Sequence, residues 1–553
     1  MPSATPQNSA GGSKETAKQS AIGLIISFVL VLAFRGFVFE PFHIPTGSMA
    51  PTLMGQHMRL RSPHSGFEWA VNPWAEQIPG TRAIRFGAPP QVMIDEEPLT
   101  HLPFSEPNPA LRAGDRIGIL KYNPLYQPRR FDVVVVKWPS SPRENYIKRL
   151  VGMPGEDLWL VDGDAFVRDP DAADEADRAW RILRKPARAQ EALWWPLFST
   201  QYAPIDATHN GREWRGPWRA GGPGDDVWAV ERDSFRFKGG QSGELVWDNE
   251  RWPITDWQPY NDYRQDGRPM TEYIPRFAMS DLRVHASVTP ETADCEIFFE
   301  IEARGHHYLA SFEPTRLRLM YYYQDPRNRA DIRFTEVAVA NGRTLPVGKI
   351  SDIAFCHVDQ SLQLWVDGEL VIEGTYDWSP AERLKWSTNL PDDQVDAMAA
   401  MADGAVGFVR GNPLADPAIY SQPTVKVICQ NGPALLQRVG LDRDVYWQPR
   451  EYPPGTPLAG RAALATHPAN VAHLGSEEFF LLGDNSANSA DSRLVDGVDP
   501  WVQATVDSKL GVIHRRMMTG RAVVVFWPSA HPLKVGGSRF SFIPDFGRMR
   551  IIW

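Results

Sequence analysis

An apolar run near the N-terminus is the feature that most restricts how this chain can fold. Residues Ala21 to Phe34 are almost wholly apolar, and after Arg35 the run resumes from Gly36 to Phe39. These 19 residues approach the roughly 20 that an α-helix needs to cross a bilayer. Arg35 is close enough to the end of the run to reach the membrane interface. No small-x-small cleavage pattern follows, so we expect an uncleaved transmembrane anchor over residues 21–39.

The short segment before this anchor carries Lys14 and Lys18. By the positive-inside tendency, we expect the tail of residues 1–20 to be cytoplasmic and the rest of the chain to lie outside. The lipid bilayer is therefore one expected partner. A net charge of -9 without a long basic run argues against a nucleic-acid partner.

The 553 residues are too many for one ordinary core and suggest about three or four domains. Frequent proline and glycine, together with abundant Trp, Tyr and Val, favour a mainly β fold with many turns. Cys295, Cys356 and Cys429 are widely spaced and form no C-x-x-C pair, so we expect buried free thiols.

The segment Ser62–Phe67 resembles a zinc knuckle with serines in place of cysteines. Neutral hydroxyls are poor zinc ligands, and we expect no metal and no cofactor.

A candidate nucleophile follows the anchor directly, within P-F-H-I-P-T-G-S-M-A-P-T-L (residues 41–53). Three prolines and a glycine exclude a helix here, whereas Phe42 and Ile44 favour an extended strand. Gly47 permits a close backbone approach just before Ser48. Ser48 is then either an exposed nucleophile at a strand end or a turn serine that bonds its own backbone, which is the commoner role.

A serine nucleophile needs a base to accept its proton. Three histidines lie nearby in the sequence, but none stands in a hydrolase motif such as G-x-S-x-G: His43, His57 and His64. Lys148, in Y-I-K-R-L-V-G-M-P-G-E (residues 146–156), is the stronger candidate. Its pKa of about 10.4 must fall through burial before it can act near neutral pH, and Tyr146 and Leu150 can supply apolar surroundings. The alternative is a solvated strand lysine.

Three segments in this order resemble the boxes of type I signal peptidases: I-P-T-G-S-M-A-P-T-L (44–53), the lysine segment (146–156) and G-D-N-S-A-N-S-A-D-S-R (483–493). The resemblance implies that Ser48 is the nucleophile and Lys148 its general base. It further implies that the Thr46 hydroxyl and the Ser48 backbone N–H stabilise the oxyanion. Ser489 is expected to hold the lysine amine in line, with Asp491 and Arg493 as a supporting ion pair. Arg149 is expected to point away from the site into a structural contact.

The resemblance also implies a substrate and a location. An exported preprotein would lie extended beside Phe42–Ile44 and Tyr146–Lys148, and it would lose its signal peptide after a small-x-small site through an acyl-enzyme. The residues expected to contact the substrate are Phe42, Ile44, Pro45, Met49, Leu53, Tyr146 and Ile147. The location implied is a bacterial inner membrane, with one membrane span and the catalytic domain on the outer, periplasmic side.

The chain departs from the family pattern at three positions. Phe131 stands where the family usually has glycine, at the corner before the expected buried strand Arg130–Lys137. Ser486 and Ala487 stand where the family often has arginine and aspartate, so one supporting salt bridge is missing or replaced.

The resemblance covers about residues 20–160 and 475–553, which predicts a catalytic core in two parts, 40–161 and 471–553. Residues 162–470 are then an insertion. Its first part is rich in tryptophan, which we expect mainly to fill a core. From Asp281 onward, short alternating segments such as Ala405–Val409 predict a two-sheet β-sandwich over about 281–447. The segment L-Q-L-W-V-D-G-E-L-V (362–371) predicts a hairpin with an Asp-Gly turn and resembles concanavalin-like (laminin-G-type) folds.

An alternative function stays open at this point. A decayed peptidase core could serve as a membrane stalk for a sandwich that binds a glycan or a protein. The changes at Phe131, Ser486 and Ala487 favour this reading, whereas the intact Ser48, Lys148 and Ser489 oppose it.

Overall fold

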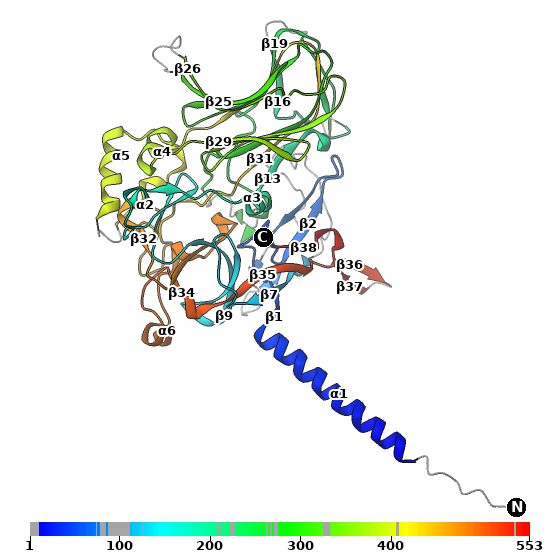
Figure 1. Ribbon diagram of the computed structural model, residues 1–553, viewed down its shortest axis with the longest axis vertical. Helices are drawn as coiled ribbons and strands as arrows, with labels where there is room; N and C mark the ends of the chain where they lie inside the picture. The colour runs from blue at the N-terminus through cyan, green and yellow to red at the C-terminus, as the bar shows by residue number, and fades with distance from the viewer. Residues whose placement is uncertain are drawn as a thin grey trace, which may run out of the picture.

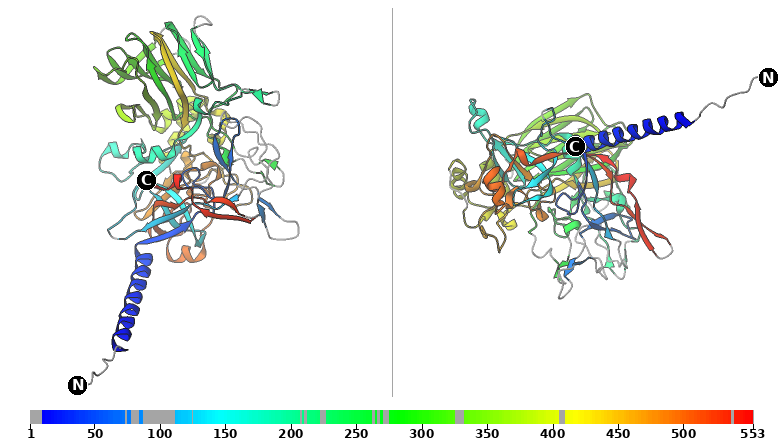
Figure 2. Two further views of the ribbon diagram at one scale, coloured as in Figure 1. Left: turned by 90° about the vertical axis from the view of Figure 1, so that its right-hand side faces the viewer. Right: turned by 90° about the horizontal axis from the view of Figure 1, so that it is seen from below.

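The computed structural model describes residues 10–72, 75–77, 84–86, 111–123, 125–206, 208–209, 212–221, 227–261, 264–265, 268–269, 275–324, 332–404, 409–535 and 538–552. These residues form a mainly β protein, as predicted, with one long N-terminal helix that projects from the body (Figures 1 and 2).

The projecting helix is α1 (Ala10–Phe37). Its segment Lys18–Phe37 is, among the described residues, the one helix long and apolar enough to cross a membrane, with a mean hydropathy of 2.1. The helix ends at Phe37, slightly before the predicted end of the anchor, because Phe39 already pairs with Leu120 as the first residue of β1. The helix thus leads directly into the core sheet.

The core sheet has the strand order β1-β7-β35-β8-β9-β33-β34, and the neighbouring strands are antiparallel. Its strands are β1 (Phe39–His43), β7 (Arg116–Lys121), β8 (Val133–Trp138), β9 (Ser141–Gly152), β33 (Glu478–Leu482), β34 (Ile513–His514) and β35 (Met518–Trp527). Strands from both sides of the expected insertion therefore form one sheet. The strand predicted around Arg130–Lys137 is confirmed as β8, whose valines are buried on both faces of the sheet.

Phe131, just before β8, has a left-handed backbone with φ 65°. This conformation costs a residue with a side chain about 1–2 kcal/mol, which explains why glycine suits the position. The Phe131 side chain is only 4% exposed and packs in a core with Val151 and Leu158. Because full burial of a phenylalanine side chain contributes about 1.5–3 kcal/mol, packing offsets the backbone strain.

A second, smaller sheet with the order β12-β11-β10-β32 continues this core. Its strands are β10 (Asp157–Val161), β11 (Asp164–Arg168), β12 (Arg181–Ile182) and β32 (Ala472–His473). The short helix α3 (Ala187–Leu193) follows β12.

Residues of the expected insertion form two antiparallel sheets that share one large hydrophobic core. One sheet contains β13 (Trp195–Ser199), β17 (Trp228–Val230), β18 (Ser234–Phe237), β22 (Leu282–Pro290), β27 (Ser351–Val358), β28 (Ser361–Val366), β29 (Glu369–Thr375) and β31 (Ala434–Arg443). The other contains β16 (Trp218–Gly221), β19 (Gly240–Trp247), β23 (Glu296–Ala303), β24 (His306–Glu313), β25 (Arg316–Gln324), β26 (Ile332–Asn341) and β30 (Thr424–Asn431). Two helices, α4 (Pro380–Ser387) and α5 (Asp392–Ala399), lie beside the sandwich (Figure 1).

Several sequence predictions for the insertion are confirmed. Asp367 and Gly368 form the turn between β28 and β29, with φ 52° and 82°. All three cysteines are free and buried. Six of the tryptophans from Trp159 to Trp257 are buried: Trp159, Trp218, Trp228, Trp247, Trp252 and Trp257. The strand expected at Ala405–Val409 lies almost wholly outside the described residues.

The sandwich also takes strands from Trp195–Trp247, ahead of the range of about 281–447 predicted from sequence. This stretch is rich in proline, glycine and charge, so its short strands lack the sustained alternation that marks β22 and β23. Long-range pairing with β30 and β31 creates these strands.

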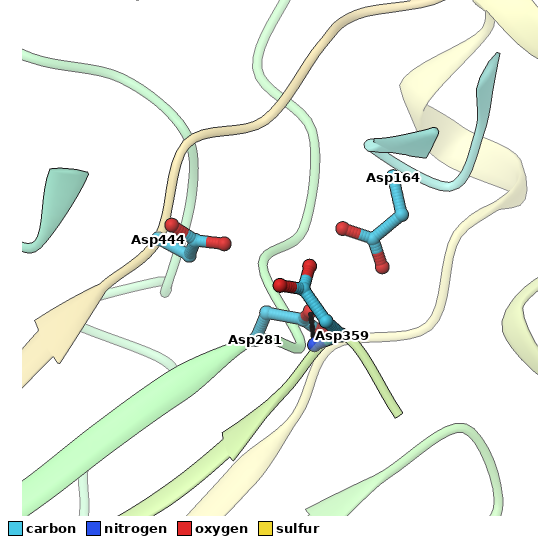
Figure 3. A group of neighbouring side chains, drawn as sticks. All are labelled: Asp164, Asp281, Asp359 and Asp444. Atoms are coloured by element: carbon cyan, nitrogen blue, oxygen red, sulfur yellow. Dashed lines mark hydrogen bonds between the residues drawn. The ribbon is translucent and has the colours of Figure 1, made fainter. Parts of the chain in front are cut away.

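A buried charge cluster joins the sandwich to the second, smaller sheet. Figure 3 shows its four carboxylates, whose oxygens lie within 4.8 Å of one another: Asp164, Asp281, Asp359 and Asp444. Three buried cations pair with them: Lys185 with Asp359 and Asp444, Arg304 with Asp281, and Arg383 with Asp164. Because every carboxylate has a cationic partner from the chain itself, the cluster has the chemistry of an ion-pair joint between β11 and the sandwich.

Candidate active site

Ser48 and Lys148 are brought together from segments one hundred residues apart. Ser48 lies in the turn that follows β1, and Lys148 lies on β9 opposite Val134 of β8. Lys148 Nζ is 2.7 Å from Ser48 Oγ, and the two residues are 2% and 7% exposed. At this distance a neutral amine can accept the serine proton, so the geometry required of a nucleophile and its base is present.

The environment of Lys148 favours the neutral amine. Burial lowers the pKa of Lys148 from its ordinary 10.5 to about 8, against the opposing influence of Asp491 and Asp484. The ring of Tyr146 lies 5.5 Å from Nζ, on the same face of β9, as strand alternation predicts. Among the described residues, the amine makes one further hydrogen bond, to the Ile147 carbonyl oxygen at 3.1 Å.

Asn485 holds the backbone on both sides of the nucleophile. Its backbone N–H donates to Ser48 O at 3.0 Å, and its side-chain Nδ2 donates to Gly47 O at 3.1 Å. A Cβ atom on Gly47 would lie 2.0 Å from the ring of Tyr260, so this position requires glycine. The sequence prediction of a close approach at Gly47 is confirmed, but the approaching residue comes from the insertion.

The two predicted oxyanion donors have no hydrogen-bond partner among the described residues. Within the described residues, neither the Ser48 N–H nor the hydroxyl of the exposed Thr46 makes a hydrogen bond. A backbone N–H and a hydroxyl of this kind, here on the nucleophile and two residues before it in the sequence, have the chemistry to stabilise the negative charge of a tetrahedral intermediate. Their roles stay predictions.

Ser489 is buried close to the site but does not make its predicted bond. Its hydroxyl has no hydrogen-bond partner among the described residues, whereas the Lys148 amine contacts the Ile147 carbonyl. A Cβ atom on Gly483 would lie 2.1 Å from Ser489 Oγ and 2.6 Å from Ser48 O, so Ser489 and the nucleophile turn flank the same glycine.

The expected pair of Asp491 and Arg493 is present and fully buried, with Arg493 Nη2 2.7 Å from Asp491 Oδ2. Burial alone would raise the pKa of Asp491, but Arg493, the Gly483 N–H and Lys148 together outweigh burial and hold this pKa below its ordinary value. The Arg493 guanidinium also donates to Ser486 Oγ at 2.8 Å. The serine at this departure from the family pattern is therefore part of the same network.

Arg149 points away from the site, as expected, and forms a two-pronged ion pair with Asp484. Both N–O distances are 2.7 Å, and the two side chains are 0% and 1% exposed. Arg149 also donates to the carbonyl of Phe131 at 2.9 Å. The pair thus connects β9, the corner before β8 and the loop after β33.

The residues predicted to contact substrate divide into two groups. Ile44, Met49 and Leu53 are at most 2% exposed and belong to one hydrophobic cluster, so they anchor the turn that carries Ser48 in the core. Phe42 and Ile147 pack on that cluster but remain partly exposed, as does Tyr146, and Pro45 is exposed.

Among the described residues, β1 pairs only with β7, and residues 141–148 of β9 pair only with β8. Two open strand edges therefore lie beside the Ser48–Lys148 pair.

None of the three histidines considered from sequence contacts Ser48. His57 is buried, with Nδ1 2.8 Å from the Gly55 carbonyl, and burial lowers its pKa to about 4. His43 and His64 make no contact with Ser48 among the interactions described. A serine hydroxyl bonded to a buried amine, with the serine's own N–H unbonded among the described residues, defines a candidate serine hydrolase site in which lysine is the candidate base.

Comparisons with known proteins relate this candidate site to signal peptidases. Residues 97–189 and 447–527 match the family model described as signal peptidase, peptidase S26. These segments contain Lys148 and the 483–493 loop but not Ser48, and residues 190–446 separate them.

Curated relatives are similar over short stretches. Signal peptidase I of Pseudomonas aeruginosa is 32% identical over 129 residues, 23% of this chain and 29% of that protein. Signal peptidase I of Rickettsia massiliae is 24% identical over 163 residues, 29% of this chain and 47% of that protein. The chain thus spans less than half the length of these relatives. Among solved structures, the carbohydrate binding module CBM66 from Bacillus subtilis is 10% identical, with a TM-score of 0.23, over 41% of this chain and 95% of that one.

Proposed function

We propose that this chain is a membrane-anchored serine endopeptidase that removes signal peptides from exported preproteins. The observation that carries the proposal is the 2.7 Å contact between Ser48 Oγ and the buried Lys148 Nζ. The family match over residues 97–189 and 447–527 supports the same activity. The apolar helix ahead of the site supports attachment to a membrane.

The proposed reaction has two stages. Neutral Lys148 takes the proton from Ser48 Oγ, which attacks the scissile carbonyl carbon, while the Ser48 N–H and the Thr46 hydroxyl stabilise the oxyanion. The C–N bond then breaks, and the departing amine takes the proton from Lys148, which leaves an acyl-enzyme. Lys148 next removes a proton from water, whose oxygen attacks the ester. The acid is released, and Ser48 regains its proton.

The proposed substrate is an extended preprotein segment that adds a strand at the open edges of β1 and β9. Phe42, Ile147 and Tyr146 are partly exposed beside these edges and can limit the side chains accepted before the cut to small ones. We place the catalytic domain on the outer side of a bacterial inner membrane, with α1 as the single span and Lys18 on the cytoplasmic side.

The activity is expected to rise with pH. Because only the neutral amine accepts a proton, kcat/KM for a preprotein with an Ala-x-Ala site should increase about tenfold per pH unit below the Lys148 pKa of about 8 and level off above it. Initial cleavage rates between about pH 6 and 10 measure this profile. A midpoint at about 6.5, the ordinary pKa of histidine, would contradict the assignment of Lys148 as the general base. A rate that falls as the pH rises to 9 would also contradict it.

A second candidate function belongs to the insertion. The face of the sheet that points away from the sandwich core lines a groove of 710 Å³ between β22, β27, β28 and the segment from α3 to Gln201. Its lining combines Trp194 and Trp365 with Arg283, Gln363 and Glu373. Aromatic rings beside guanidinium, amide and carboxylate groups suit a polyhydroxylated ligand such as a glycan. This function does not require a decayed peptidase core, and the intact Ser48–Lys148 contact disfavours decay.

Replacing Trp365 by alanine should weaken glycan binding by about tenfold or less, because one stacking partner is lost. Titration of the full chain in detergent with soluble oligosaccharides, followed by calorimetry, measures the change. Trp501→Ala is a suitable control, since Trp501 is exposed on α6 (Pro500–Thr505), outside the insertion. Equal affinity of the Trp365 variant and the parent, or no binding by the parent, would show that the groove is not a glycan-binding site.

A further inference from the structure

A turn of the insertion reaches the nucleophile. The short helix η2 (Pro259–Asn261) places Tyr260 and Asn261 against the segment that carries Ser48, and both side chains are at most 2% exposed. Tyr260 covers Gly47 with its ring, and its hydroxyl donates to the Gln56 carbonyl at 3.0 Å. Its own carbonyl accepts a hydrogen bond from the backbone N–H of Asn72 at 3.1 Å. The turn is thus built into the site.

Asn261 forms a reciprocal amide pair with Asn485. Asn261 Nδ2 donates to Asn485 Oδ1 at 2.9 Å, and Asn485 Nδ2 donates to Asn261 Oδ1 at 2.8 Å. The other N–H of Asn485 Nδ2 donates to Gly47 O. Both N–H groups of the Asn485 side chain are therefore used, and both residues are 1% exposed.

The Gly47 carbonyl and Asn261 together determine the orientation of the Asn485 side-chain amide. If the amide rotated by half a turn, its oxygen would oppose the Gly47 carbonyl, and two acceptors would meet in a buried place. Asn261 disfavours rotation of the Asn485 amide alone, because the donor and acceptor of Asn261 match the orientation that the Gly47 carbonyl sets. Asn485 then holds the Gly47 and Ser48 carbonyls, which places the Ser48 hydroxyl and N–H.

We infer that Asn261 is a positioning residue for the nucleophile, acting through Asn485, so that the insertion completes the peptidase site. The inference rests on the proposed function and adds a residue from outside the segments that match the family. A displacement of about 1 Å in a reacting group can reduce the rate by about 100-fold. Asn261 does not touch Lys148 among the described interactions, so it should not alter the titration of the base.

The test compares Asn261→Asp and Asn261→Ala with the parent chain. The aspartate variant keeps the size of the side chain but replaces the donor with an acceptor, which opposes Asn485 Oδ1. We expect kcat for preprotein cleavage to fall about 10- to 100-fold in both variants, with KM changed less than about threefold and the pH midpoint unchanged. Asn249→Asp changes an amide that donates to the Pro423 carbonyl within the sandwich, and it should retain the parental kcat.

Amide hydrogen exchange in the peptide from Ile44 to Leu53 provides a second readout that needs no activity. Faster exchange in the Asn261 variants, with the sandwich peptides unchanged, is expected. Parental kcat together with parental exchange in both folded variants would overturn the inference. If the parent chain itself cleaves no preprotein, the proposed function fails, and the exchange measurement alone decides whether Asn261 orders the nucleophile turn.

Discussion

Replacing Ser48 by alanine or Lys148 by methionine is expected to lower kcat for preprotein cleavage by about 10⁴-fold or more. Ser48→Ala removes the atom that forms the acyl bond. Lys148→Met keeps an unbranched side chain of similar length but removes the amine that lies 2.7 Å from Ser48 Oγ. Because the two groups act as a unit, the double variant should be little worse than either single one. Single-turnover cleavage followed by mass spectrometry measures all three rates.

Folding of these variants can be checked independently of activity. Removing a buried amine whose pKa is lowered to about 8 should not destabilise the chain, because the protonated amine that predominates at neutral pH is less stable in the folded state than in the unfolded state. A matched control is Lys426→Met on β30, a lysine of the sandwich, which should retain parental activity. Cleavage at even a tenth of the parental rate by a folded Ser48→Ala or Lys148→Met chain would refute the assignment.

Replacing Asp484 by alanine is expected to destabilise the part of the chain built on the core sheet by about 3–5 kcal/mol. The change leaves the guanidinium of Arg149, which is 0% exposed, without its ionic partner. For a domain of this size, such a loss lowers the melting temperature by on the order of 10 °C. Thermal unfolding in detergent, monitored by fluorescence, measures the shift.

Two further variants test whether the loss of stability comes from leaving a buried charge unpaired or from losing any salt bridge. Asp177→Ala removes the partner of Arg181 in a pair whose side chains are 64% and 47% exposed, and its effect should stay below about 1 kcal/mol. The double variant Arg149→Met and Asp484→Leu should recover at least half of the lost stability, because no unpaired charge remains. Equal melting temperatures for Asp484→Ala and Asp177→Ala would show that the buried pair contributes no more to stability than the exposed pair.

Local sequence was sufficient for those features that depend on neighbouring residues. The apolar run predicts the membrane helix because helix length and hydropathy suffice to define a span. Consecutive valines predict β8, and Asp367-Gly368 predicts the hairpin turn because its backbone needs two left-handed residues. The motif around Ser48 and the motif around Lys148 likewise name a candidate nucleophile and base.

Only the tertiary structure decided how these pieces meet. The contact between Ser48 and Lys148, the burial that lowers the lysine pKa and the pairing of β9 with β33 all depend on segments far apart in the chain. Asn261 has no motif of its own and gains its place only because the insertion folds back onto the nucleophile turn. Ser489 fits a motif, yet its hydroxyl has no hydrogen-bond partner among the described residues, and the Lys148 amine contacts the Ile147 carbonyl instead. The residues within a short segment determine whether it forms a helix, a strand or a turn. The distances between groups that are far apart in the sequence depend on how the whole chain packs.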